Sequence, residues 1–307
     1  MAEWIKQEQF LVLSDSSEMA DADRQAIGGR TRSNTQLLPC YDARASGEVA
    51  EWSKAPVSKT GRGESLSGVR ISPSPPNMNS ISEKDDFETL GKSLESPEVL
   101  EKYKNACGGF RPSLLPQILG GFLVFAGNLV YGKKPSYLKF RAVEVIARVP
   151  YQSWTSAIFT LLTFCYTNET RAMELSKISR YATLAQDNET MHVIVISKLA
   201  KAERRAGVIR HTLIPMLFAF VYFWASYFLY LLNPRWSHEL NYLFENHAFE
   251  QYSTFIDTHV EELKKKPLSS EFLSWYGRTP VNQYEFFISV RNDELIHRNT
   301  SCLASKS

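Results

Sequence analysis

The chain has 307 residues, of which 44% are hydrophobic and 12% aromatic, a composition that suits one sizeable folded domain with appendages. Its net charge of +2 argues against nucleic-acid binding, because no surplus of Lys and Arg is present to neutralise phosphates. The four cysteines form no Cys-x-x-Cys pair, so they predict neither a disulfide framework nor a zinc site. We expect reduced thiols, some of them buried.

The region 1–100 differs in composition from the rest of the chain. It is rich in Ser, Gly, Asp and Arg and shows little helical or strand periodicity, which predicts a mostly disordered segment. Glu3 and Glu8 argue against a secretory signal, whereas the Ser-rich, basic stretch Gly28–Pro76 fits an organelle transit peptide better. Gly47–Pro75 also resembles conceptual translations of structural-RNA genes. We therefore interpret 1–100 as a transit peptide or a gene-model artefact and infer no function from it.

The remaining chain, 101–302, is predicted to form one all-α domain, because no segment shows clean strand alternation. We expect six long helices. They are Pro112–Tyr131, Leu138–Phe164, Arg171–Arg205, Thr212–Leu232, Trp236–Lys264 and Val281–Asn299. Asn233-Pro234 and Thr279-Pro280 are suitable helix boundaries, since proline breaks one helix and can open the next.

Two of these helices, Pro112–Tyr131 and Thr212–Leu232, are apolar and uncharged, and by length each could cross a membrane. If both crossed, residues 133–211 and 233–307 would lie on opposite sides of roughly 30 Å of hydrocarbon. The metal ligands described next come from both segments and must converge. We therefore expect the two apolar helices to lie in one leaflet beside a four-helix bundle, as in a monotopic membrane protein.

A repeated motif carries the chemistry of the chain. Glu189-Thr-Met-His192 and Glu294-Leu-Ile-His297 each place a carboxylate and an imidazole on one helix face. Each motif is preceded by a single glutamate in an apolar setting, Glu144 and Glu245, and each of these lies thirteen residues after an apolar helix. Two single glutamates and two Glu-x-x-His pairs on four helices are the ligand set of ferritin-like di-iron or di-manganese bundles.

Less specific explanations exist for each residue taken alone. One Glu-x-x-His occurs by chance on many solvated helix faces, and Glu144 or Glu245 alone is as consistent with a salt bridge as with a ligand. The set of six favours ligation, and its oxygen-rich character suits iron or manganese rather than zinc. His238 and His247 lie near Glu245 without a matching spacing, so we interpret them as packing or outer-shell groups.

The residues in these positions resemble those of the alternative oxidase family, and within it the plastid terminal oxidase branch. The matching phrases are VEVIARVPY (Val143–Tyr151), DNETMH (Asp187–His192), FLYLLNPR (Phe228–Arg235), FENHAFEQYSTF (Phe244–Phe255) and VRNDELIH (Val290–His297). The resemblance covers about Tyr137–Asn299. It implies a monotopic, homodimeric membrane enzyme that oxidises quinol and reduces O2 to water at two iron ions without pumping protons. The implied iron ligands are Glu144, Glu189, His192, Glu245, Glu294 and His297.

The resemblance also implies roles for residues around the ligands. Asn188 and Asp293 match outer-shell positions of the family. Tyr252 matches a tyrosine proposed to supply an electron and a proton during oxygen cleavage. Lys139 stands where the family often has an arginine beside the quinol, so Lys139 and nearby Arg141 are the candidate quinone contacts.

Three departures from the family pattern concern the branch and the organelle. Lys139 replaces the arginine, the insertion usual before the last helix of the plastid branch is missing from Pro267–Pro280, and Trp275-Tyr276 has its order reversed. A plastid thylakoid location is favoured, with the mitochondrial inner membrane as the alternative. Two other functions remain open: a related di-iron membrane hydroxylase or desaturase, and a non-catalytic membrane protein with two spans.

Overall fold

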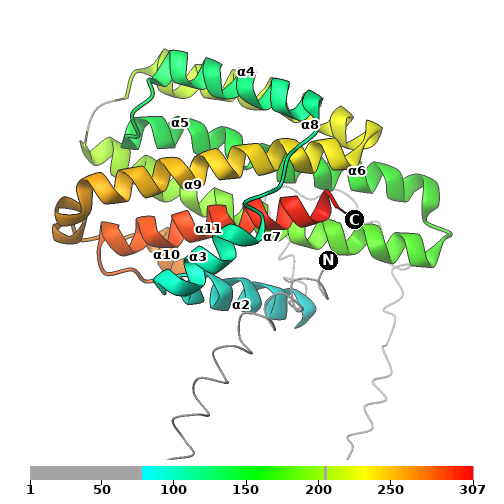
Figure 1. Cartoon of the computed structure of the whole chain (residues 1–307), viewed down its shortest axis with the longest axis horizontal. Helices are drawn as coiled ribbons and strands as arrows, with labels where there is room; N and C mark the ends of the chain where they lie inside the picture. The colour runs from blue at the N-terminus through cyan, green and yellow to red at the C-terminus, as the bar shows by residue number, and fades with distance from the viewer. Residues whose placement is uncertain (1–77, 204–205, 307) are drawn as a thin grey trace, which may run out of the picture. The chain divides into compact units, whose positions relative to one another are not determined.

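The computed structural model describes residues 78–203 and 206–306, and the part of the predicted disordered region before residue 78 lies outside the described residues. Within that part of the chain the secondary structure is helical without strands, which confirms the predicted all-α class. The elements are α2 (Met78–Ser93), α3 (Pro97–Ala106), α4 (Leu114–Tyr131), α5 (Tyr137–Ala147), α6 (Val149–Cys165), α7 (Glu169–Glu203), the short π-helix η1 (Ile209–Leu213), α8 (Ile214–Leu232), α9 (Pro234–Lys265), α10 (Glu271–Tyr276) and α11 (Gln283–Ala304) (Figure 1).

Two helices begin before residue 101, the predicted start of the domain: α2 and α3 occupy 78–106. Phe87, Leu90 and Leu94 are buried and recur at three- and four-residue intervals, so they form one apolar face of α2 and its C-terminal end. Charged residues separate them in the sequence, and the face is too short to give a clear periodic signal. Tertiary packing against α11, not local propensity, makes this segment helical.

Two predicted helices are each divided at a proline. The predicted helix Leu138–Phe164 is α5 followed by α6, with Pro150 in the first turn of α6. The predicted helix Thr212–Leu232 is η1 followed by α8, with Pro215 in the first turn of α8. Proline lacks the N–H that would continue the preceding helix, but it is tolerated in a first turn where that N–H has no intrahelical partner. The short helix α10 was not predicted.

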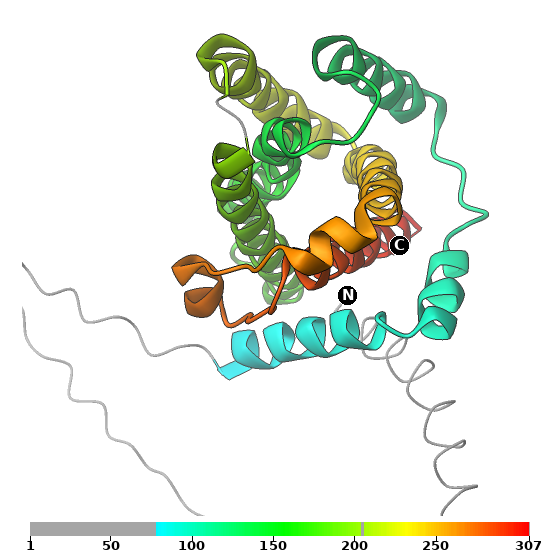
Figure 2. The ribbon, with the colours of Figure 1, turned by 90° about the vertical axis from the view of Figure 1, so that its left-hand side faces the viewer.

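The helices α5, α7, α9 and α11 enclose the interior of the bundle, as the end-on view in Figure 2 shows. A large buried cluster at one end joins α5, α7, α9, α10 and α11 through aromatic and branched residues, among them Phe140, Ile196, Phe255 and Phe287. A second cluster at the other end joins α6, α7 and α8 around Trp154. The polar interior between these clusters is therefore held by packing on both sides.

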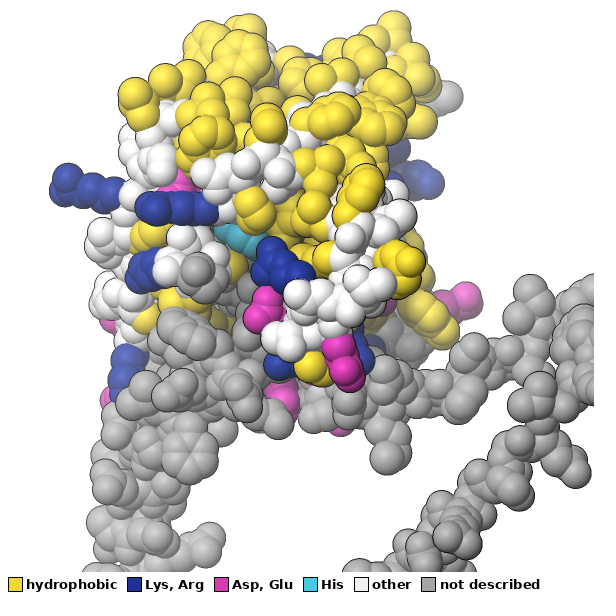
Figure 3. Space-filling view, turned by 90° about the vertical axis from the view of Figure 1, so that its right-hand side faces the viewer, with side chains coloured by type: hydrophobic (Ala, Val, Ile, Leu, Met, Phe, Trp, Pro, Cys, Tyr) yellow, Lys and Arg dark blue, Asp and Glu magenta, His cyan; other side chains and the backbone are white. Residues whose placement is uncertain are grey.

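The apolar helices α4 and α8 lie outside the bundle, and few of their side chains are buried. Over their apolar windows only 11% of α4 and 22% of the segment Ile209–Leu232 is buried. Gly120 lets α4 approach α9 closely, since a Cβ there would meet a side-chain atom of Leu243 at 3.0 Å. The outward residues form a broad apolar surface at the top of the space-filling view (Figure 3). Leu114, Ile118, Phe122, Phe125, Leu129, Met216, Leu217, Phe220, Val221 and Phe228 are among them.

Candidate metal centre

The four glutamates and two histidines of the repeated motif come from four different helices and are all buried. Glu144 lies on α5, Glu189 and His192 on α7, Glu245 on α9, and Glu294 and His297 on α11. Glu144, Glu189, His192 and Glu294 each offer one ligand atom within 4.8 Å of the others. This group brings together segments on either side of the apolar helix α8.

The ligand atoms of this group lack ordinary hydrogen-bond partners among the described residues. Both carboxylate oxygens of Glu189 and Glu294, one of Glu144, and Nδ1 of His192 are buried and unpaired. His192 Nδ1 lies 3.6 Å from Glu144 Oε2, 3.5 Å from Glu189 Oε2 and 3.4 Å from Glu294 Oε1. Buried polar atoms without partners are costly, so several of them converging on one point fit a metal ion.

Charge gives a second test of the fit. Burial is the largest of the effects that raise the pKa of Glu189, Glu245 and Glu294, and neighbouring carboxylates raise these pKa values further. No Lys or Arg among the described residues pairs with any of the four glutamates in the ion pairs of the structure. Two divalent cations would balance the negative charges of four ionised carboxylates. The donor set therefore fits two iron or manganese ions.

The two remaining predicted ligands, Glu245 and His297, lie at the edge of this group. Glu245 Oε1 accepts hydrogen bonds from the Tyr151 hydroxyl at 2.7 Å and from Asn241 Nδ2 at 3.0 Å. His297 Nε2 lies 3.4 Å from Glu189 Oε1, and its Nδ1 lies 3.2 Å from the Tyr181 hydroxyl. Burial lowers the pKa of His297 to about 3, so its imidazole is neutral.

A tyrosine from each half of the chain donates a hydrogen bond to a glutamate of the other half. Tyr151 follows Glu144 by seven residues and donates to Glu245, whereas Tyr252 follows Glu245 by seven residues and donates to Glu144 Oε1. Both tyrosines are buried, and burial followed by the charge of the adjacent glutamate raises their pKa well above the usual value. Each hydroxyl is therefore protonated and fixes a carboxylate of the other half.

The residue before each Glu-x-x-His motif accepts a hydrogen bond from the histidine of the other motif. Asp293 Oδ2 accepts a hydrogen bond from His192 Nε2 at 3.0 Å, and Asn188 Oδ1 accepts one from His297 Nε2 at 2.9 Å. Asn188 Nδ2 then donates to Asp293 Oδ2 at 3.1 Å and joins the two networks. Burial lowers the pKa of His192, but the charge of Glu189 and the hydrogen bond to Asp293 outweigh it and raise this pKa well above its usual value. With Nε2 held by Asp293, Nδ1 is the nitrogen that faces the carboxylates and that would bind a metal in place of its proton.

Arg278 holds Asp293 in this network. Its Nη1 and Nη2 donate to the two carboxylate oxygens of Asp293, with the Nη2–Oδ1 distance at 2.9 Å. Burial opposes ionisation of Asp293, but the charge of Arg278 outweighs it and holds the pKa of this carboxyl well below its usual range. The histidine thus faces a permanent carboxylate, which raises its strength as a ligand.

Comparison with known proteins agrees with this geometry. Residues 127–304, more than half of the chain, match the family model described as "Alternative oxidase". The chain belongs to the alternative oxidase family. It is similar to "Ubiquinol oxidase 4, chloroplastic/chromoplastic" of Arabidopsis thaliana, with 26% identity over 185 residues. That similarity covers 54% of this chain and 50% of the relative, so the chain spans about half the relative's length. No solved structure matches the chain at a significant level.

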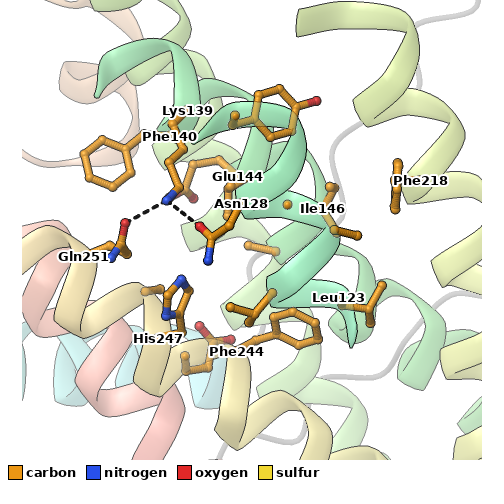
Figure 4. Close-up of a pocket in the computed structure, with 18 of the residues that line it drawn as sticks. Leu123, Asn128, Lys139, Phe140, Glu144, Ile146, Phe218, Phe244, His247 and Gln251 are labelled. Carbon is orange, nitrogen blue, oxygen red and sulfur yellow. Dashed lines mark hydrogen bonds between the residues drawn. The ribbon is translucent and has the colours of Figure 1, made fainter. Parts of the chain in front are cut away.

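Beside the centre, this alternative oxidase has an apolar cavity between α4, α5, α8 and α9 (Figure 4). Its lining includes Leu123, Asn128, Lys139, Phe140, Val143, Glu144, Ile146, Phe218, Phe244, His247, Gln251 and Tyr252. The lining also includes Glu245, so the cavity reaches two predicted ligands, Glu144 and Glu245, and Tyr252, which donates to Glu144.

Lys139 is the cation at the polar end of this cavity. Its ammonium donates to Asn128 Oδ1 at 3.0 Å, to the Lys133 carbonyl at 3.1 Å and to Gln251 Oε1 at 2.9 Å. Burial lowers its pKa. All three of its protons are used by acceptors of the protein, so Lys139 contributes charge and orients Gln251 and Asn128.

The other residues singled out from the sequence lie in different places. Arg141 is absent from the cavity lining, and its Nη2 lies 3.4 Å from Thr212 Oγ1. His247 lines the cavity. His238 is buried against Trp154, with ring centroids 4.4 Å apart, and burial lowers its pKa to about 4, so it is a neutral packing residue.

Sequence reasoning missed Tyr151, Asn241 and Arg278. The seven-residue offset that singled out Tyr252 from Glu245 also leads from Glu144 to Tyr151, so the repeat held the signal for Tyr151. Arg278 has no such signal, because its partner Asp293 lies on a separate helix, α11. Asn241 lies one helical turn before Glu245, but its bonds to Tyr151 and Ser301 are made to other helices.

Proposed function

We propose that this family member is a membrane-bound quinol oxidase that reduces O2 to water at a di-iron centre. The observation that carries the proposal is the position of Glu144, which belongs to the group of unpaired ligand atoms and also lines the apolar cavity. A quinol in that cavity would lie next to the first ligand. The similarity to a chloroplast ubiquinol oxidase supports this substrate class.

The ligands of the proposed centre are Glu144, Glu189, His192, Glu245, Glu294 and His297. Two iron ions bound there would supply one-electron steps and a binding place for O2. The protein's own groups then have defined tasks. Asp293 and Asn188 hold the histidine rings, Tyr151 and Tyr252 hold carboxylates of opposite halves, and Tyr252 is the proton and electron donor closest to the cavity.

The stoichiometry accounts for protons without any transfer across a membrane. Two quinols release four electrons and four protons, and one O2 takes up four of each to give two water molecules. Gln251 and His247 supply the polar contacts for a quinol head, Lys139 contributes charge and holds Gln251, and the apolar lining suits the quinol ring and tail. We therefore propose oxidation without proton pumping.

We further propose that the protein enters the bilayer from one face, with the exposed surfaces of α4 and α8 in contact with lipid. If α4 and α8 both crossed, Glu144 and Glu294 would be roughly 30 Å of hydrocarbon apart. Their ligand atoms instead belong to one group within 4.8 Å. A plastid membrane is favoured by the chloroplast relative, and a homodimer by the family resemblance.

Oxygen uptake by the purified full chain tests the proposed function. We expect uptake with decyl-plastoquinol or decyl-ubiquinol in the presence of cyanide, and a ratio of two quinols oxidised to one O2 consumed. Glu189→Ala and His297→Ala should each abolish uptake, because a ligand is lost. Glu250→Ala is the matched control, since Glu250 is exposed on α9 and its side chain accepts a hydrogen bond from Asn246, outside the centre.

The same preparation separates the alternatives. A hydroxylase or desaturase would consume O2 and leave a hydroxylated or unsaturated product that mass spectrometry detects. A non-catalytic protein would be helical by circular dichroism and contain no iron. Full uptake by the Glu189→Ala variant would contradict the ligand assignment.

A further inference from the structure

The helix α2 lies against α11 at the metal centre, although it precedes the residues that match the family. Figure 2 shows α2 and α3, the two cyan helices, beside α11 at the outside of the bundle. Asn292 Nδ2 donates to the Gly91 carbonyl at 3.0 Å, and the Phe87 ring lies 5.5 Å from the His297 ring. Segment 78–106 is therefore in direct contact with residues at and beside the predicted ligands.

A charged chain leads from α2 to a ligand. Arg278 Nε donates hydrogen bonds to the two carboxylate oxygens of Glu88 at 3.0 Å and 2.9 Å. The two Nη atoms of Arg278 donate to the two carboxylate oxygens of Asp293. Asp293 Oδ2 accepts from His192 Nε2 at 3.0 Å. The guanidinium thus lies between two carboxylates, one on α2 and one on α11.

The backbone before Arg278 fixes where this guanidinium starts. Gly277 ends α10 with φ of +103°, in the left-handed region, and the N–H groups of Gly277 and Arg278 both donate to the Leu273 carbonyl at 2.9 Å. Arg278 therefore leaves the end of a helix in one defined direction. The side chain of Arg278 is 9% exposed and that of Glu88 22%. Water therefore competes little for the hydrogen bonds of Arg278 and more for those of Glu88.

A planar guanidinium with partners on two edges has one orientation, whereas a guanidinium held on one edge can tilt. Tilting would move Asp293, and Asp293 fixes both the tautomer and the ring plane of His192. We infer that Glu88 and Arg278 are positioning residues of the metal centre, acting through Asp293 on His192. This inference rests on the proposed function, because it assumes that iron binds at these ligands.

The rate at which iron is lost tests the inference without measuring activity. Iron(II)-loaded full-length protein is mixed anaerobically with excess ferrozine, and release is followed by absorbance. Outer-shell changes typically cost about 10–100-fold in metal affinity, so we expect Arg278→Met to speed release by about that factor. Glu88→Gln, one step further away, should speed it by about 3–10-fold. Glu101→Gln is the matched control, because Glu101 pairs with Lys104 on the exposed side of α3.

A double variant separates positioning from general loss of stability. If Glu88 acts only through Arg278, Glu88→Gln should add nothing to release from Arg278→Met. The melting temperature of the metal-free Glu88→Gln protein should stay close to that of the Glu101→Gln control, while the Mössbauer spectrum of the iron-loaded variant differs from wild type. If Arg278→Met does not fold, Arg278→Lys, which keeps the charge and loses the planar fork, takes its place.

Three results would overturn the inference: wild-type release rates in the Arg278 variants, full additivity in the double variant, or faster release matched by an equal loss of metal-free stability. Wild-type protein that binds no iron would overturn the proposed function as well. Wild-type protein that binds iron and oxidises quinol, with unaltered release in the variants, would overturn the inference alone.

Discussion

At the scale of single residues, Tyr151 and Tyr252 are related by the internal repeat but differ in what surrounds them. Each donates a hydrogen bond to a glutamate of the opposite half. Only Tyr252 also lines the apolar cavity, and it stacks on Phe140 with ring centroids 4.1 Å apart. Tyr151 shares Glu245 with Asn241 instead. The same hydrogen bond therefore lies at the cavity in one half and away from the cavity lining in the other.

This difference predicts unequal effects of removing each hydroxyl. Tyr252→Phe should lower the rate of quinol-dependent O2 uptake by about 100-fold or more, the range expected when a positioned proton donor is lost. Tyr151→Phe should lower the free energy of unfolding by about 1–3 kcal/mol, because Glu245 loses a buried donor, and change uptake far less. Oxygen-electrode assays and urea unfolding of the same preparations measure both. Equal losses of uptake in the two variants would contradict the distinction.

At the scale of helices, the sequence predicts most of the bundle and fails where packing decides. Long apolar or motif-bearing segments predicted six helices close to their final positions. The two Glu-x-x-His motifs supply three residues of the group of ligand atoms, and the single glutamate Glu144 supplies the fourth. The breaks at Pro150 and Pro215 were missed because each proline is compatible with either a kink or a new helix. The helix α2 was missed because α11 supplies the surface that orders it.

The site shows the same limit. The predicted ligands follow from residue type and spacing within one helix, which a sequence contains. The partners of the ligands, such as Arg278 on Asp293 and Asn241 on Glu245, depend on which helices become neighbours. Asn241 precedes Glu245 by one helical turn, but its bonds to Tyr151 and Ser301 require α6 and α11 beside it.

The exposed surface of α4 and α8 yields a prediction about attachment to lipid. We expect the double variant Phe122→Asp and Phe220→Asp to lose binding to liposomes by more than about 100-fold, since each aspartate placed in hydrocarbon costs roughly 2.5–3.5 kcal/mol. Phe122 and Phe220 are 64% and 65% exposed, so folding should be little affected. Trp275→Asp is the control, because Trp275 is 78% exposed on α10, outside these helices. Co-sedimentation with liposomes measures binding. Retention of wild-type binding by the double variant would contradict the proposal that this surface contacts lipid.

At the scale of the whole molecule, the groups that oppose folding are concentrated where the predicted metal ligands meet. Buried aromatic clusters close both ends of the bundle, while four carboxylates from α5, α7, α9 and α11 converge between them. Whether a carboxyl there is ionised or takes up a proton, bringing it out of water without a partner costs free energy. Metal ions that bind only the folded state return stability, by about 2.7 kcal/mol for one site when the free ion exceeds its Kd 100-fold.

This balance predicts opposite effects of one substitution with and without metal. Glu189→Gln keeps the shape of the side chain, cannot ionise, and adds amide N–H donors beside carboxylate oxygens of Glu144 and Glu294 that have no hydrogen-bond partner within the described residues. The metal-free variant should therefore be more stable than metal-free wild type by about 1–3 kcal/mol, the cost of an unsatisfied buried polar group. With iron(II) added under anaerobic conditions the order should reverse, because the variant has lost a ligand. The control, Glu239→Gln, removes a buried glutamate bound to Arg235 and the Ser113 N–H outside the centre, and it should lower stability in both conditions. Calorimetric melting of the three proteins with a chelator and with iron(II) measures these differences, and a metal-free Glu189→Gln protein that melts below wild type would contradict the prediction that these carboxylates oppose folding until metal binds.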